Sequence, residues 1–321
     1  MEVIVLSDKK CELIAKSIGG QAVIEGVMMR GKSMYCMAVR NYNTKEISIE
    51  KKEVLSVNNR AKILRLPFIR GIASFVDSLV LGMKIITRSA SLSGLDGDEK
   101  EDKKSKLDIW LENKFGEKLT DYIIYFSVFV SIILSIAIFM VLPVWISGFI
   151  TRAFNISLWG IGIVEGIVRI LIFLFYLLLI SKMKDVQRLF KYHGAEHKTI
   201  NCFEKGDELT VENVLNHTRL HKRCGTSFLI IVMIVSMIVF MFLKTDNITI
   251  RVLSRVVLVP LIAGISYEII KFAGKCDNVF VKIISAPGMA LQKLTTKEPE
   301  KDMIETAILA LKGVLEEEGN V

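Results

Sequence analysis

The sequence predicts an α-helical polytopic membrane protein with about four transmembrane helices, a small α+β cytoplasmic region at its N-terminus and a His-rich cytoplasmic loop. Hydrophobic residues make up 51% of the 321 residues, and the stretches 122–151 and 226–243 contain no charged side chain. Both reach the roughly 18 to 20 residues that a helix needs to cross a bilayer. The stretches 156–181 and 252–272 are also apolar but are interrupted by charged residues. Together the four stretches predict two transmembrane hairpins, and the composition excludes a disordered or disulfide-rich chain.

Residues 1–62 are predicted to form a cytoplasmic Gly-rich and β-hairpin region. β-Branched and aromatic residues at 33–40 and 47–54 flank a polar turn at 41–45, a pattern typical of two paired strands. Four glycines punctuate the stretch that precedes them.

Residues 63–92 are predicted to form an amphipathic interfacial or re-entrant helix. Apolar residues recur at helical spacing, and Arg70, Asp77 and Lys84 fall at intervals of seven on one face. A helix of this length with charges on one face is expected to lie in the membrane interface or to pack between other helices rather than to span.

The remaining segments follow from charge and hydropathy. We expect a charged linker at 93–120, a transmembrane hairpin at 121–182, the His-rich loop at 183–225, a second hairpin at 226–274 and a C-terminal amphipathic helix region at 275–321. In the last of these, Ile304, Ile308, Leu311 and Leu315 share one helix face, which is typical of a packing or oligomer surface.

The distribution of Lys and Arg predicts the orientation of the chain. Residues 183–225 carry many basic side chains, whereas the tips of the two hairpins carry few. The segment 183–225 and both termini are therefore expected on the cytoplasmic side. The net charge of +8 follows from this bias, so no nucleic acid is expected as a partner.

Charged residues inside the predicted spans need partners, because a charge within the bilayer costs at least about 2.5 to 3.5 kcal/mol. Glu165 and Arg169 stand at i, i+4, whereas Arg255 and Glu268 lie near opposite ends of the last span. The spacing favours an ion pair within one helix near the interface. The alternative is a polar path through a helix bundle.

All four histidines of the chain lie in the segment 183–225, in two pairs at i, i+4. This spacing places two imidazoles on one helix face, close enough to share a cation. His193 and His197 form the first pair and enclose Glu196 in an H-x-x-E-H pattern. In this pattern both histidines bind zinc and the Glu serves as general base.

Further ligand candidates follow in the same segment. His217, His221 and Cys224 offer imidazole and thiol donors, and cytoplasmic cysteines are expected to be reduced and available. The segment thus predicts a divalent metal site, with zinc as the metal and Glu196 as the catalytic base. The alternative is that the histidines make polar contacts between the loop and the membrane-facing surface.

Five motifs carry a resemblance to a known family. They are "GGQAVIEGVMMRG" at 19–31, "LPFIRGIASFVDSLVLGMK" at 66–84, "YHGAEHKTINCFE" at 192–204, "HTRLHKRCGTSFL" at 217–229 and "PGMALQKLTTKEPE" at 287–300. The chain resembles, over nearly its full length, the YqhQ-like family of bacterial membrane proteins of unknown function, which carry the label of predicted metal-dependent enzymes.

The resemblance implies an inner-membrane location and a set of motif residues. In this chain they are Gln21, Glu25, Arg30, Arg70, Asp77, His193, Glu196, His197, His217, His221 and Cys224. Glu25 is thereby a further candidate metal ligand, and the alternative is that it pairs with Arg30.

The function that the sequence favours is a metal-dependent hydrolase that acts at the inner membrane surface. One alternative is a non-enzymatic homo-oligomeric membrane scaffold or pore, and another is a transporter. A transporter is disfavoured because the sequence shows neither inverted repeats nor matched helix breaks. The expected partners are the lipid bilayer and further copies of the chain, and the residues indicate no particular substrate.

Overall fold

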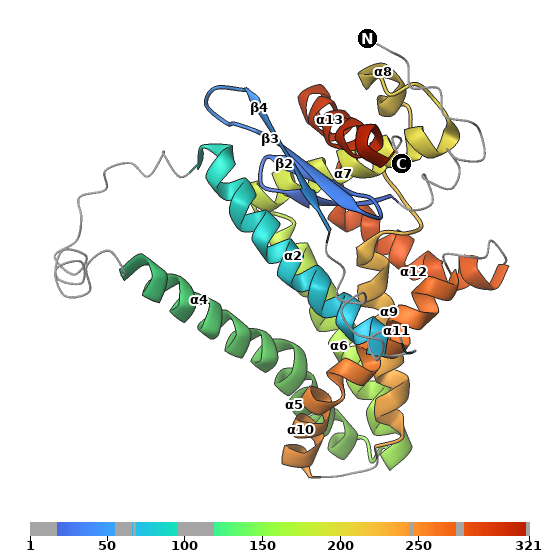
Figure 1. Ribbon diagram of the computed structural model, residues 1–321. Helices are drawn as coiled ribbons and strands as arrows, with labels where there is room; N and C mark the ends of the chain where they lie inside the picture. The colour runs from blue at the N-terminus through green and yellow to red at the C-terminus, as the bar shows by residue number, and fades with distance from the viewer. Residues whose placement is uncertain are drawn as a thin grey trace. The chain divides into compact units, whose positions relative to one another are not determined.

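The computed structural model describes residues 18–54, 66, 69–95, 119–243, 247–273 and 279–318 (Figure 1). They fall into two compact units. The sheet unit comprises Met1–Asp96, Leu177–Val232 and Pro260–Val321, and the helical unit comprises Gly97–Tyr176 and Met233–Val259. Almost all of the predicted charged linker lies outside the described residues.

A four-stranded antiparallel sheet with the order β1-β2-β3-β4 organises the sheet unit. Its strands are β1 (Gly19–Val23), β2 (Gly26–Arg30), β3 (Met34–Arg40) and β4 (Ile47–Glu53). The predicted hairpin at 33–54 is confirmed as β3 and β4. The strands β1 and β2 were not predicted, because glycines interrupt the alternating pattern that marks a strand.

Tight packing at Gly26 explains why a glycine occupies β2. A Cβ atom there would lie 2.2 Å from the carbonyl oxygen of Ala38 on the neighbouring strand. The turn before it places Glu25 at φ 54°, a left-handed backbone conformation that is uncommon for residues other than glycine.

Helices cover both faces of the sheet. The helices α7 (Lys184–Lys205) and α13 (Lys301–Glu318) pack on one face, and α2 (Ile69–Ser93) packs on the other. Successive side chains of a strand point to opposite faces, so Met29 lies in the cluster under α13 while Met28 lies in the cluster with Ile85 of α2.

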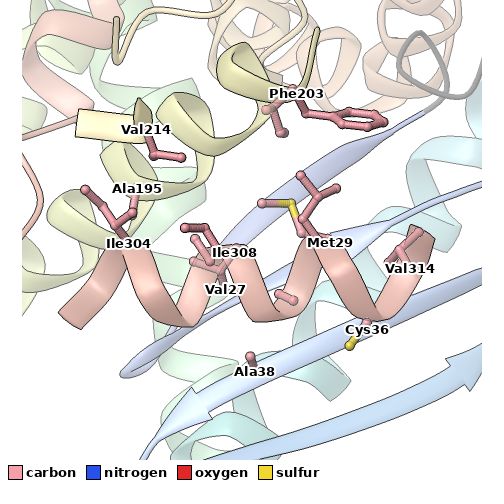
Figure 2. Packing of buried hydrophobic residues seen from close by; sticks show 14 of the residues in the cluster. Val27, Met29, Cys36, Ala38, Ala195, Phe203, Val214, Ile304, Ile308 and Val314 are labelled. Carbon is pink, nitrogen blue, oxygen red and sulfur yellow. The ribbon is translucent and has the colours of Figure 1, made fainter. Parts of the chain in front are cut away.

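The C-terminal amphipathic helix is confirmed as α13. Figure 2 shows Ile308 of α13 beside Val27 of the sheet and Ile304 beside Ala195 of α7 and Val214 of α8, all in one buried cluster. The apolar face that the sequence left open as a packing or oligomer surface is buried within its own chain.

The segment 183–225 contains two helices, α7 and α8 (Val211–Leu215). Asp185 in the first turn of α7 and Lys205 in its last turn complement the helix dipole, and Gly206 at φ 77° caps its end.

Gly194 inside α7 has a packing reason. Glycine weakens a helix by about 1 kcal/mol relative to Ala, but a Cβ atom at Gly194 would lie 2.0 Å from the carbonyl oxygen of Lys297. The N–H of Lys297 donates to the carbonyl of Phe190 in α7 at 2.9 Å. Gly194 therefore lets the segment before α13 run directly against α7.

The apolar segments form helices. They are α4 (Leu119–Ile136), the π-helical turn η5 (Ala137–Val141), α5 (Leu142–Ala153), α6 (Leu158–Ile180), α9 (Gly225–Met241), α10 (Ile248–Val257), α11 (Val259–Ala273) and α12 (Val279–Thr295). Phe126–Ala153 and Gly160–Ile180 are each long and apolar enough to cross a membrane.

The described residues thus contain two candidate spans, or three if α10 and α11 count as one broken span, where the sequence predicts four. The helix α9 is apolar but has only 17 residues. Pro260 explains the break between α10 and α11, because its ring lacks an N–H and clashes with a preceding helical turn.

A buried charge cluster joins the helices of the helical unit. The predicted pair of Glu165 and Arg169 is confirmed at 2.8 Å. The same carboxylate also accepts from Arg251 at 2.9 Å and from Arg255 at 2.8 Å. Arg255 therefore forms its ion pair with Glu165 within the helical unit. In the sheet unit, Glu268 pairs with Arg70.

Candidate metal centre

The helix α7 brings the H-x-x-E-H residues to one place. His193 and His197 lie on the same face, with ring centroids 4.4 Å apart. The Sγ atom of Cys224, just before α9, lies 3.3 Å from Nε2 of His193. One nitrogen from each imidazole and this sulfur all lie within 4.8 Å of one another. The three residues are thus close enough to share one metal ion.

Backbone carbonyls orient both imidazoles. Nδ1 of His193 lies 2.9 Å from the carbonyl oxygen of Thr295, and Nδ1 of His197 lies 2.6 Å from that of Arg219. A carbonyl only accepts, so each Nδ1 carries the hydrogen and donates it. Each Nε2 then keeps its lone pair, which is the arrangement of metal-binding histidines.

Nε2 of His197 gives a direct indication that a ligand belongs here. This atom is buried and has no hydrogen-bond partner among the described residues, although buried polar atoms are nearly always paired. Burial lowers the pKa of both His193 and His197. Both imidazoles are therefore neutral at pH 7, the form that binds a metal.

Cys224 supplies the third donor. It is a free cysteine, like the other described cysteines. Burial, followed by the charge of Glu196, raises the pKa of the Cys224 thiol to about 11. A cysteine binds metal as thiolate, so metal binding here has to release a proton.

Glu196 points from α7 toward the edge strand β1. Its carboxylate accepts a hydrogen bond from the backbone of Ala22, and burial raises its pKa to about 8. Its Oε2 atom is buried without a partner in the described part of the chain. A Cβ atom at Gly20 would lie 2.7 Å from Oε1, so a glycine at this position gives the carboxylate its space.

A cavity of about 610 Å³ lies beside these groups, entirely within the sheet unit. The donors His193, His197 and Cys224 line it together with Glu196. Residues of β1, β2 and α2 complete its walls. The three donors and the carboxylate therefore face one space that has room for a substrate.

The second histidine pair has carboxylate partners instead. His217 Nε2 lies 3.0 Å from Oδ2 of Asp207, and His221 Nε2 lies 3.3 Å from Oε1 of Glu204. The ring of His221 lies 5.7 Å from that of His197 and also lines the cavity. The structure thus brings His221 near the centre but leaves His217 apart from it.

Glu25 lies apart from the three donors as well. Its carboxylate forms an ion pair with Arg188 of α7 and lies 3.4 Å from the hydroxyl of Tyr192. Glu25 therefore pairs with Arg188 and not with Arg30, the partner that the sequence offered as an alternative.

Comparison with known proteins agrees with the resemblance found in the sequence. A family model described as "Protein of unknown function (DUF1385)" matches residues 66–317. The protein of Bacillus subtilis (strain 168) named "Uncharacterized protein YqhQ" is 36% identical over 299 residues, which cover 92% of this chain and 91% of that protein. No solved structure matches the chain. The chain belongs to the DUF1385 family, and its resemblance to YqhQ is confirmed.

Proposed function

We propose that this protein is a metal-dependent hydrolase that acts at the cytoplasmic surface of the bacterial inner membrane. The observation that carries the proposal is the convergence of two imidazole nitrogens and one thiol sulfur within 4.8 Å beside a cavity that also receives Glu196. Catalytic zinc sites use three protein ligands and keep a further position open. Structural zinc sites use four.

The donor set favours zinc. Imidazole nitrogen and thiolate sulfur together suit Zn²⁺, whereas Mg²⁺ and Ca²⁺ prefer oxygen ligands. His193, His197 and Cys224 would hold the zinc ion, which would supply Lewis acidity to polarise a substrate and make water more acidic.

Glu196, in its ionised form, is the group that accepts the proton, and this form dominates above the pKa of about 8 that burial gives it. Its Oε2 atom, which has no partner among the described residues, belongs to a carboxylate that lines the cavity. The contact of Glu196 with β1 fixes the side chain. A water molecule in the cavity gives its proton to this carboxylate as it attacks the substrate. The protonated Glu196 then returns the proton to the leaving group, as a general acid.

The location follows from the helices and from the charge distribution. The candidate spans Phe126–Ala153 and Gly160–Ile180 suit a membrane environment. The excess of Lys and Arg in 183–225 supports a cytoplasmic position for α7 and both termini, by the positive-inside rule.

Replacing Glu196 with Gln tests the proposal. The variant should keep its metal, because Glu196 is not among the three donors, and it should lose about 10²–10⁴-fold in turnover, the contribution of a general base. The measurements are metal content and hydrolysis of chromogenic carboxylic esters, amides and phosphate esters.

The matched control is Glu208→Gln, since Glu208 is exposed and precedes α8. This control should keep both the metal and the turnover. Full turnover in Glu196→Gln would contradict the role of Glu196 as the base, and an equal loss in both variants would show that the effect is not specific.

A further inference from the structure

Arg30 is an arginine that lines the cavity. It closes β2, pairs in register with Gly19 of β1 and is half-buried. Among the residues that the structure describes, no carboxylate pairs with its guanidinium group. A half-buried guanidinium is a fork of donors that matches a carboxylate or a phosphate.

The strand register explains how Arg30 reaches the cavity. Residues opposite each other on paired strands point to the same face of the sheet, and the residue opposite Arg30 is Gly19. A Cβ atom at Gly19 would have no neighbour within 4 Å. Arg30 therefore lies on the same face of the sheet as Met28, the face that α2 covers, and lines the same cavity as Glu196.

The rest of the wall is largely apolar. Met28, Leu81, Leu189 and Phe190 line the same cavity, so a ligand held by Arg30 also meets hydrocarbon surface. A small inorganic anion would leave this surface without a partner. An apolar group bound there is removed from water, and each further CH₂ that it buries tightens binding.

The helix α2 connects this wall to an exposed apolar surface. Ser78 and Leu81 of α2 line the cavity, while Val76, Leu79, Val80 and Met83 of the same helix are at least half exposed. Helical spacing places these four residues around the side of α2 that faces away from Leu81. A helix with one exposed apolar side fits the membrane interface.

We propose that the cavity binds a membrane amphiphile with an anionic headgroup, whose anionic group pairs with Arg30 and whose apolar part lies against Met28, Leu81 and Phe190. This inference names the substrate class of the proposed hydrolase and so rests on that function. The occupant is a lipid of the surrounding bilayer, which reaches the cavity beside α2.

The test uses the full-length protein in phosphatidylcholine nanodiscs with hexyl phosphate and inorganic phosphate as probes, followed by calorimetry. Hexyl phosphate should bind at least about tenfold more tightly than inorganic phosphate because of its chain. Arg30→Gln should weaken hexyl phosphate binding by about tenfold or more, since it removes a charge-assisted hydrogen bond. Arg30→Lys keeps the charge and should recover part of this loss.

The matched control is Arg152→Gln, because Arg152 is an exposed arginine outside the cavity. It should bind both probes like the wild type. Equal binding of hexyl phosphate by Arg30→Gln and wild type overturns the inference. It is also overturned if the wild type binds inorganic phosphate as tightly as hexyl phosphate, or binds neither.

Metal content, measured on the same samples, separates this inference from the proposed function. Arg30→Gln should keep its metal, since Arg30 is not one of the three donors. If the wild-type protein holds metal but does not bind hexyl phosphate, only the proposed substrate class is contradicted. If the wild-type protein holds no metal, the proposed hydrolase function is contradicted, whatever the binding of the two probes.

Discussion

Replacing Glu165 with Ala should lower the free energy of unfolding by about 3–5 kcal/mol, the cost of removing one partner from a buried ion pair. Glu165 is 1% exposed and accepts hydrogen bonds from Arg169, Arg251 and Arg255. Without it, the three guanidinium groups lose their shared carboxylate in an apolar environment. The arginines come from α6 and α10, so the packing of the helical unit depends on this residue.

Denaturant titration in mixed micelles, followed by circular dichroism, measures the effect. The matched control is Glu316→Ala, which removes an exposed carboxylate that pairs with Lys51 at 2.8 Å. An exposed pair contributes about 0–1 kcal/mol. If the two variants lose equal stability, the cluster around Glu165 does not hold the helices together.

Adding Zn²⁺ should raise the thermal stability of the wild-type protein and leave that of a His193→Ala, His197→Ala variant unchanged. A ligand that binds only the folded state stabilises it by about 2.7 kcal/mol when its free concentration is 100 times its Kd. Nε2 of His197 is buried and has no partner in the described part of the chain, and it gains one when the metal binds.

His217→Ala is the matched control for this effect. His217 pairs with Asp207 and is not one of the three donors, so its loss should leave the zinc-dependent rise in melting temperature intact. If His217→Ala abolishes the rise as completely as the double variant, the metal is bound by a different set of residues.

The fold could be predicted from the sequence where a pattern is local. The hairpin of β3 and β4, the amphipathic helix α13 and the helix α2 follow from spacing of two or of three to four residues. The strands β1 and β2 could not, because Gly19, Gly20 and Gly26 break the alternation. Two of these glycines are explained only by tertiary neighbours, because a Cβ atom at Gly26 would meet the carbonyl oxygen of Ala38 and one at Gly20 would meet Glu196.

The residues of the metal centre could likewise be predicted from the sequence only in part. The i, i+4 spacing placed His193 and His197 on one face without help from the rest of the chain. The choice of Cys224 over His217 depends on tertiary contacts. Asp207 pairs with the imidazole of His217, while the carbonyls of Thr295 and Arg219 orient the rings of His193 and His197. A contact with a backbone carbonyl leaves no pattern in the sequence.

The most direct test of the metal centre is elemental analysis of detergent-purified protein, with wild type beside the His193→Ala, His197→Ala variant. We expect a stoichiometric divalent metal, zinc, in the wild type and its loss in the variant. A well-folded wild type that contains no metal after purification without chelator would contradict the metal centre and, with it, the proposed hydrolase.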